Sequence, residues 1–430
     1  MVDAVSAALA SGRTAIVLVP EADPVPGTAR ALAEAFGDDV VLYLGGDKRQ
    51  RYRMWLDIQS RRYRCVVGTR PAVFAPLPEL GLIWISRESH AAHREERSPY
   101  YHVRDVALAR ATIQGAVCVM AALCLSTEAA VQEAQDVVPS RRSWLPVEVV
   151  RPGPEGRAAR LLVALRQARR TFLYEPLPGY GIARICRSCG EPASCASCGG
   201  VLRMAGGVVR CSVCEAPGRC SICGGDRFGV ARGGAERVEQ WSRGLTSVPV
   251  RRVTAETVSA PGGEQVMVGG ADAVRDVGPL GLDLVGILDA DLAGRRPGLS
   301  SRERALAAWM EAAGWARPNG RVIVQSRHPG DPAIQSLVAG NPDRFHREEM
   351  ARRREAGFPA GSCVFRVAGT ADLPNLLDAE IPITLLTSGQ GDETVCLVAV
   401  RWEAVGSFGR TLRTLAERGV VSRVEAEPHL

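Results

Sequence analysis

Eight of the 13 cysteines are grouped as four Cys-x-x-Cys pairs in the middle of the chain. The pairs are Cys186/Cys189, Cys195/Cys198, Cys211/Cys214 and Cys220/Cys223. Two intervening residues let a tight turn bring both sulfurs of a pair to one metal ion, and neighbouring glycines give the backbone the freedom that such turns need. Four thiolates around an ion leave no open coordination position. The spacing therefore predicts two structural zinc ions rather than a catalytic metal.

Four pairs can combine into two sites in three ways. The two inner pairs flank residues 200–210, which can fold back as a hairpin and close one site, and the two outer pairs then meet at its base. This favours one site of Cys195, Cys198, Cys211 and Cys214 and a second site of Cys186, Cys189, Cys220 and Cys223. An iron–sulfur cluster and redox-active dithiols are the alternatives for the same spacing.

The composition is that of a soluble globular protein with two or three domains. The chain has 430 residues, of which 46% are hydrophobic and 23% are charged. We find no export signal and no apolar run of about 20 residues, so we expect a cytoplasmic, nucleoid-associated protein. Thiols in such a compartment are reduced, which favours metal binding over disulfides.

The formal net charge of +6 is carried almost entirely by arginine, and Lys48 is the only lysine. A GC-rich coding bias explains this usage, but arginine keeps the ability to bind phosphate. Clusters of arginines are the candidate DNA contacts, and they lie at Arg49–Arg53, Arg61–Arg64, Arg141/Arg142 and Arg347–Arg354.

The elements that must position these residues alternate between strands and helices. In the first part we expect strands at Ala15–Pro20, Val40–Leu44, Arg64–Gly68, Leu82–Ile85 and Ala116–Ala121, with helices at Thr28–Phe36 and Val103–Thr112. In the second part we expect helices at Arg157–Arg170 and from Ala235, with strands at Thr171–Tyr174, Val250–Val253, Gln265–Gly269, Leu284–Asp289 and Arg321–Ser326. This alternation predicts two parallel, doubly wound sheets.

The pattern changes after about residue 328. Two helices, Pro332–Ala339 and Pro342–Arg354, precede strands at Cys363–Gly369 and Thr394–Arg401 and a helix at Ala404–Arg418. We therefore expect a small C-terminal α+β domain.

Several segments resemble, in order, the motifs of the primosomal protein N-prime (PriA) family of replication-restart helicases. The similar segments are Val17–Glu21, Val67–Pro76, Tyr101–Asp105, Gly286–Asp291, His328–Pro329 and Gly357–Pro359. The cysteine-rich insertion also resembles the zinc module of that family. The resemblance extends from about residue 13 to about residue 360.

This resemblance implies an α/β fold of two RecA-like helicase lobes with a two-zinc, all-cysteine insertion. We expect a degenerate first lobe at 1–138, a linker at 139–156, a degenerate second lobe at 157–330 with the zinc-binding insertion at 186–223, and the α+β domain at 331–430.

The residues that the family uses for ATP hydrolysis are replaced in this chain, as in a degenerate member of actinobacterial type. The family's P-loop, whose lysine reaches the nucleotide phosphates, is expected to lie outside the chain. The family's DEEH box falls on Ser86–Ser89, where a serine and Arg87 stand in place of metal-binding acids. The arginine fingers fall on Trp315 and Pro318, and Arg317 is one position away. We expect no catalytic residue, no nucleotide-binding residue and no helicase activity.

The resemblance implies a replication-restart protein that binds stalled or abandoned forks and promotes primosome assembly for reloading of the replicative helicase. Its expected partners are forked or single-stranded DNA and the primosome and helicase-loading proteins. One alternative is an active ATP-dependent 3′-to-5′ DNA helicase. Another is a zinc-ribbon adaptor that binds protein and makes no DNA contact.

A few other residues could be taken for a catalytic site. Four of them have no nucleophile or metal partner near them in sequence and are interpreted as surface or capping residues: Glu88, His90, His93 and His102. Asp289 and Asp291 follow a buried strand, where doubly wound folds place ligands. We expect these two aspartates to cap the next helix or to hold the lobe interface.

Overall fold

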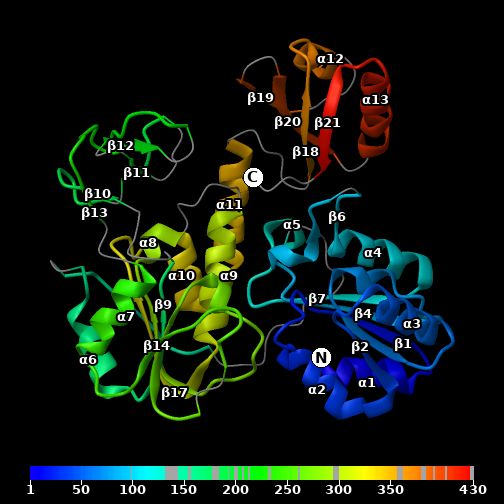
Figure 1. Cartoon of the computed structure of the whole chain (residues 1–430), viewed down its shortest axis with the longest axis horizontal. Coiled ribbons are helices and arrows are strands. Elements are labelled where there is room, and N and C mark those ends of the chain that lie inside the picture. The colour runs from blue at the N-terminus through cyan, green and yellow to red at the C-terminus, as the bar shows by residue number, and fades with distance from the viewer. Residues whose placement is uncertain are drawn as a thin grey trace.

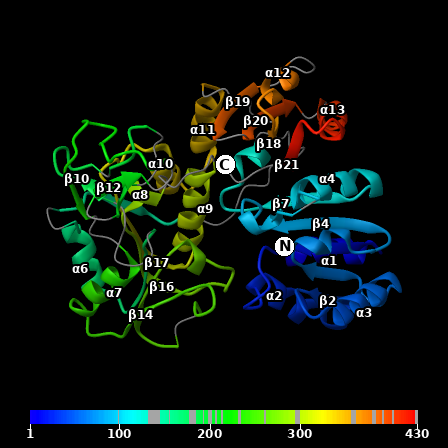
Figure 2. The same ribbon diagram turned by 45° about the horizontal axis from the view of Figure 1, so that its top comes forward.

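The protein forms two α/β lobes, a small cysteine-rich module and a C-terminal α+β unit (Figure 1). The structure is a computed structural model. It describes residues 1–97, 99–130, 144–153, 156–176, 184–191, 193–197, 202–205, 208–211, 214–230, 234–259, 262–293, 300–355, 362–378, 384–390, 393–401 and 404–426. The lobes lie side by side, with the module beside the second lobe and the C-terminal unit beside the first (Figures 1 and 2).

The first lobe is built on a five-stranded parallel sheet in the order β2-β3-β1-β4-β7. Its strands are β1 (Thr14–Leu18), β2 (Val40–Tyr43), β3 (Cys65–Gly68), β4 (Leu80–Ser86) and β7 (Val117–Ala121). Its helices are α1 (Val2–Ala10), α2 (Gly27–Phe36), α3 (Lys48–Gln59), α4 (Val103–Gln114) and the short α5 (Thr127–Ala130). The central strands β1 and β3 are buried at every position, which explains why their sequences are continuous apolar runs.

The second lobe contains a six-stranded parallel sheet in the order β14-β15-β9-β16-β17-β8. Its strands are β8 (Val147–Val150), β9 (Arg170–Tyr174), β14 (Val250–Arg252), β15 (Gln265–Gly269), β16 (Leu282–Ile287) and β17 (Ala316–Gln325). Its helices are α6 (Ala159–Gln167), α7 (Ala235–Arg243), α8 (Ala290–Ala293), α9 (Ser301–Ala313) and α10 (Pro332–Ala339). Strand β8 lies within the segment that the prolines led us to expect as a linker, so the second sheet begins inside that segment.

The cysteine-rich module leaves the second lobe between β9 and α7. It contains two small antiparallel ladders, one of β10 (Arg184–Cys186) with β13 (Phe228–Val230) and one of β11 (Leu202–Ala205) with β12 (Val208–Cys211). The β11–β12 ladder is the hairpin predicted between the inner cysteine pairs. With so little apolar core, the module needs another source of stability.

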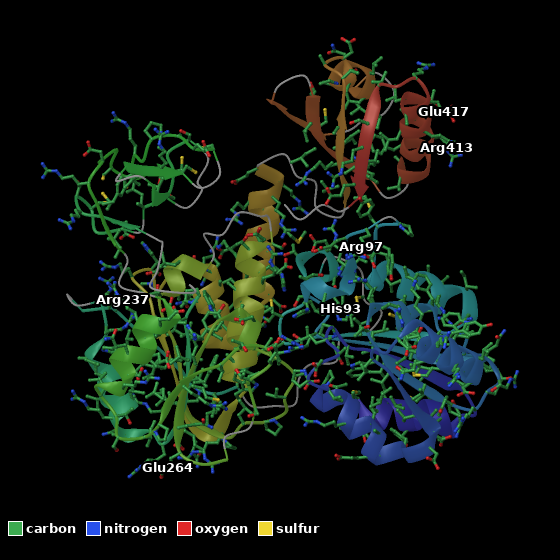
Figure 3. All side chains as sticks on the ribbon, viewed as in Figure 1. His93, Arg97, Arg237, Glu264, Arg413 and Glu417 are labelled. Carbon is green, nitrogen blue, oxygen red and sulfur yellow. The ribbon has the colours of Figure 1, made fainter. Side chains whose placement is uncertain are left out.

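The C-terminal unit follows α11 (Asp343–Glu355), which stands between the two lobes in Figure 1. Its antiparallel sheet has the order β19-β20-β18-β21 and carries two helices. The elements are β18 (Ser362–Gly369), α12 (Leu373–Asp378), β19 (Thr384–Gln390), β20 (Glu393–Arg401), α13 (Val405–Glu417) and β21 (Val421–Ala426). Side chains of α13 such as Arg413 and Glu417 point outward (Figure 3). This unit is the expected α+β arrangement.

Among the longer helices, α1, α3 and α9 were not expected from the sequence. Helix α3 carries a start signal that could have revealed it, because Asp47 and Gln50 form a capping box. Helix α9 is buried over most of its length, so its sequence lacks the polar face of a surface helix. Within the described residues, no helix is both long and apolar enough to cross a membrane.

Candidate functional site

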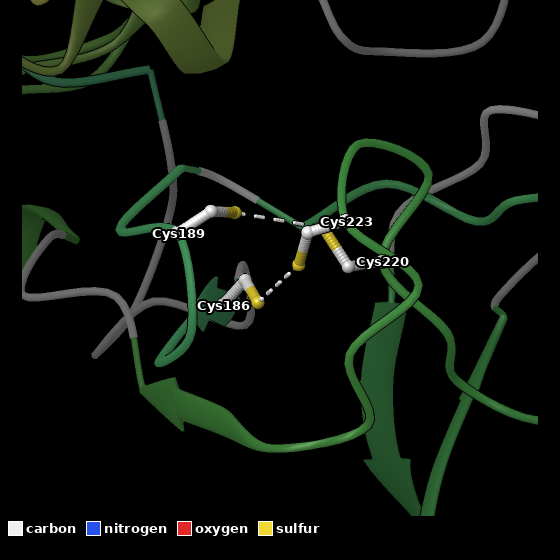
Figure 4. A group of neighbouring side chains, drawn as sticks. All are labelled: Cys186, Cys189, Cys220 and Cys223. Carbon is white, nitrogen blue, oxygen red and sulfur yellow. Dashed lines mark hydrogen bonds between the residues drawn. The ribbon is translucent and has the colours of Figure 1, made fainter.

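The four outer cysteines of the module converge on one point. The sulfurs of Cys186, Cys189, Cys220 and Cys223 all lie within 4.8 Å of one another. The Sγ atoms of Cys186 and Cys223 are 3.5 Å apart, and those of Cys189 and Cys220 are 3.8 Å apart (Figure 4). The β10–β13 ladder brings the two distant pairs together, because it pairs Cys186 with Phe228 close behind the second pair.

Three of the four inner cysteines form a second cluster. The sulfurs of Cys195, Cys211 and Cys214 lie within 4.8 Å of one another, and those of Cys195 and Cys214 are 3.6 Å apart. The β11–β12 hairpin carries Cys211 back toward Cys195. Cys198 lies outside the described residues.

The distances within both clusters fit a tetrahedral metal site. A Zn–S bond of about 2.3 Å in a tetrahedron separates the sulfurs by about 3.8 Å, close to the spacing seen here. A disulfide would need about 2.05 Å between sulfurs, so the thiols are not paired with one another. The two clusters could therefore each hold a metal ion.

The module is joined to the second lobe next to the outer cluster. Glu191 follows the Cys186/Cys189 turn, and its Oε2 lies 3.0 Å from Nε2 of His328 in the loop after β17. Gly190 approaches Arg327 of the same loop. The outer cysteine cluster thus rests on the carboxyl end of the second sheet.

Arg87, directly after β4, makes contacts with both lobes. Its guanidinium donates to Glu21 Oε2 at 2.9 Å, to Glu311 of α9 at 3.0 Å and to the carbonyl of Val274 at 2.7 Å. Arg87 has a φ of 52°, in the left-handed region that costs energy for an arginine. Because Glu311 and Val274 belong to the second lobe, this single side chain links the two lobes.

Glu21 is held as an anion in the same network. Burial by itself raises the pKa of Glu21, but a hydrogen bond with His90 and the positive charges of Arg87 and Arg275 bring it down to about 2. Arg275 comes from the second lobe and lies 3.3 Å from Glu21 Oε1. The carboxylate of Glu21 is therefore neutralised by arginines from both lobes.

A second contact between the lobes occupies the start of α2. The backbone N–H of Thr28 donates to Asp276 Oδ2 at 2.9 Å, and the N–H of Gly27 donates to the Asp276 carbonyl at 2.7 Å. A Cβ at Gly27 would come within 2.9 Å of the Asp276 carboxylate, so glycine allows this close approach.

The residues at and beside the arginine-finger positions provide no free cation among the described residues. Trp315 is buried and packs edge-on against Phe172, with 5.0 Å between the ring centroids. Arg317 pairs with Asp283 at 2.8 Å, at the amino-terminal edge of the second sheet. Pro318 is exposed at the start of β17.

Glu88 is not the surface residue that we expected from the sequence. Its carboxylate is fully buried and accepts hydrogen bonds from Arg104 at 2.7 Å and from the backbone N–H of Ser126 at 2.8 Å. The neighbouring Thr127 donates through its N–H and hydroxyl to Glu303 of α9. The beginning of α5 is thus held by one carboxylate from each lobe.

Arg353 completes this second network and is not the phosphate contact that we expected. It is buried in α11 and pairs with Glu128 at 2.8 Å, with Glu349 at 3.1 Å and with Glu303 at 3.3 Å. Arg352 pairs with Glu349. Burial and the charge of Glu128 raise the pKa of Glu303, and Arg353 offsets that charge. The arginine cluster Arg347–Arg354, which we expected to contact DNA, therefore includes one arginine, Arg353, that stabilises the fold.

Three of the histidines singled out in the sequence have structural roles, and one of them is buried. His93 lies inside the first lobe (Figure 3) and donates from Nε2 to the Ser86 carbonyl at 2.8 Å. Burial lowers the pKa of His93 to about 4, so its ring is neutral. His102 caps α4 by accepting from the Arg104 N–H, and His90 caps a short 3-10 turn at Ala91–His93.

The aspartates after β16 form contacts within the second lobe. Asp289 pairs with Arg157 at 3.2 Å, and Asp291 accepts from the Ser326 hydroxyl and from the Arg327 N–H. They tie the end of β16 to the segments before α6 and after β17.

Comparisons with known proteins place these features in context. The chain matches no protein-family model. It is 30% identical over 416 residues to the probable replication restart protein PriA of Mycobacterium tuberculosis, covering 86% of this chain and 62% of the relative. It is 29% identical to the Mycobacterium leprae protein (88% and 64% covered) and 27% identical to the Bacillus subtilis replication restart protein PriA (82% and 49% covered).

The chain thus spans about half to two thirds of the length of these relatives. Among solved structures, RecG bound to a three-way DNA junction matches with a TM-score of 0.40 and 13% identity, covering 81% of this chain and 41% of that one. A Mycobacterium smegmatis Lhr helicase structure with single-stranded DNA and AMP-PNP matches with a TM-score of 0.36 and 11% identity, covering 76% and 42%.

Proposed function

We propose that this chain, which belongs to the PriA family of replication restart proteins, acts in replication restart as a DNA-binding scaffold without helicase activity. It would bind abandoned or stalled forks and support primosome assembly for reloading of the replicative helicase. The observation that carries the loss of motor activity is Arg87, which pairs with Glu21 of the first lobe and Glu311 of the second. A motor lobe pair must open and close around nucleotide, and these ion pairs would hold the two lobes together.

We further propose that the module holds two zinc ions per chain. Cys186, Cys189, Cys220 and Cys223 would hold one, and Cys195, Cys198, Cys211 and Cys214 the other. Zinc bound by four thiolates would supply folding energy and no catalysis. The sulfur spacing in the described clusters supports this assignment. The module would then present a rigid surface to DNA or to primosome proteins.

Purified protein should show no DNA-stimulated ATP hydrolysis. Ser86 and Arg87 stand in place of the family's metal-binding acids, and Trp315 stands where an arginine finger would act; such a finger is worth about 10³–10⁵ in rate in related sites. A steady-state phosphate-release assay with forked DNA measures this. Turnover of about 1 s⁻¹ or faster that follows the protein through purification would favour the active-helicase alternative.

The same protein should bind forked DNA weakly and in a salt-dependent manner. The net charge is +6, and non-specific contacts to phosphates give dissociation constants of about 10⁻⁴–10⁻⁶ M at physiological salt. Fluorescence anisotropy at two salt concentrations tests this expectation. If no binding occurs even at low salt, the protein-only adaptor is the better description. Arg353 is excluded as a contact because it is buried.

A further inference from the structure

Helix α3 forms one side of an open groove that combines aromatic rings with cations. The groove has a volume of about 310 Å³ and is lined by Tyr43, Lys48, Arg51, Tyr52 and Trp55. Figures 1 and 2 place α3 at the edge of the first lobe, apart from the cysteine-rich module. Strand β2, which carries Tyr43, is the edge strand of the sheet, and no further strand among the described residues pairs with it on this side.

The cations of α3 are not used to hold the fold. Lys48, Arg49, Arg51 and Arg53 are all exposed, and none of them pairs with an acidic group in the part of the chain that the structure describes. Nearby arginines behave differently: Arg61, Arg62 and Arg64 face Glu79, Asp57 and Asp39 respectively. The positive charge of α3 is therefore available to a ligand.

Among the aromatic side chains of the groove, Tyr52 is exposed, whereas Tyr43 and Trp55 are partly buried. Tyr52 is 64% exposed, and Leu56, one turn further along the same helix, is 44% exposed. Ile58 is the buried anchor of α3, so the helix turns most of its surface outward. A tyrosine ring beside unpaired cations offers a flat surface for stacking next to a site for phosphate.

We propose that this groove binds single-stranded DNA, with bases stacked on Tyr52 and Trp55 and phosphates contacted by Lys48 and Arg51. The inference rests on the proposed function, which supplies DNA as the partner, and it assigns the contact to a specific face. Single-stranded DNA fits better than duplex because its base faces are free to stack, whereas duplex DNA presents mainly phosphates to a surface helix.

The test is the affinity of the full chain for fluorescein-labelled oligothymidylate, measured by anisotropy. Tyr52→Ala should weaken binding about fivefold or more, because one stacked base is lost. Tyr52→Phe keeps the ring and should keep the affinity. Phe74→Ala removes another exposed aromatic residue of the first lobe, outside the groove, and should have no effect. Binding of all three variants to blunt duplex should equal that of the unmodified chain.

Two further measurements keep the proposal testable if Tyr52→Ala fails to fold. Arg51→Gln should reduce the slope of log affinity against log salt by about one. Photocrosslinking with 5-iodouracil DNA should label the peptide that contains Tyr52 and Trp55.

Three other outcomes would overturn the proposed binding site. If Tyr52→Ala and Arg51→Gln bind oligothymidylate like the unmodified chain, the groove is not the site, while the proposed function stands. If polyglutamate competes as well as oligothymidylate, the groove recognises charge alone and the stacking proposal is overturned. If the unmodified chain binds no DNA, the proposed function fails together with this inference.

Discussion

Replacement of Arg353 by methionine should lower the free energy of unfolding by about 3–5 kcal/mol, because removing one partner of a buried ion pair leaves its counter-charges uncompensated. Arg353 is 8% exposed and lies between Glu128, Glu303 and Glu349, two of which are buried. Urea unfolding followed by tryptophan fluorescence reports the change, since Trp309 and Trp315 lie in the core of the second lobe.

Arg347→Met is the matched control for this experiment. Arg347 is on the same helix, is exposed and forms no ion pair within the described part of the chain, so its replacement should change stability by no more than about 0.5 kcal/mol. Adding Glu303→Gln to Arg353→Met should recover part of the lost stability, because it removes one of the carboxylates that no longer has Arg353 as its partner. Equal stability of Arg353→Met and the unmodified chain would show that the network does not join the lobes.

Replacement of Cys186 or of Cys195 by serine should each remove one of two bound zinc ions and unfold the module around it. Structural zinc contributes about 10–16 kcal/mol of apparent binding free energy in small zinc-dependent domains, and the module has little other core. Metal analysis of protein prepared without chelators should give about two zinc ions for the unmodified chain and about one for each variant. Limited trypsin digestion should cut the variants within 184–230 while both lobes remain intact.

Ser188→Ala is the control for the outer site, because Ser188 lies between Cys186 and Cys189 and is exposed. It should keep both metal ions and the protease resistance of the unmodified chain. A metal content of one or none in the unmodified protein would contradict the two-site proposal. Protease resistance of the Cys195→Ser module would contradict the claim that zinc supplies its folding energy.

Much of the fold could be predicted from local patterns. The strands β1, β2 and β3 begin and end within one or two residues of their expected bounds, because buried parallel strands are continuous apolar runs. The cysteine pairs were recognisable because the ligand spacing is set by a single turn of backbone. Strand β8 was missed because the prolines and glycines around it resemble a linker.

The errors at Glu88, His93 and Arg353 have a common physical cause. Each is polar, and polar residues are usually exposed, so sequence alone assigns them to the surface. Their burial depends on partners far away in the chain: Arg104 and Ser126 for Glu88, and Glu128 and Glu303 for Arg353. No local sequence pattern predicts such a partner.

The sequence by itself determined the residue types of this protein's chemistry: eight thiols at metal-ligand spacing, an arginine and a serine at the metal-binding box, and a tryptophan at the finger position. These residue identities are fixed by the covalent structure and do not depend on folding. Only the tertiary structure decided what those residues do to one another. Arg87, which replaces an acid of the family, forms ion pairs that join the two lobes. The cations of α3 are exposed and have no acidic partner among the described residues. Only the tertiary structure could decide this, because the charges that surround a side chain come from residues far away in the sequence.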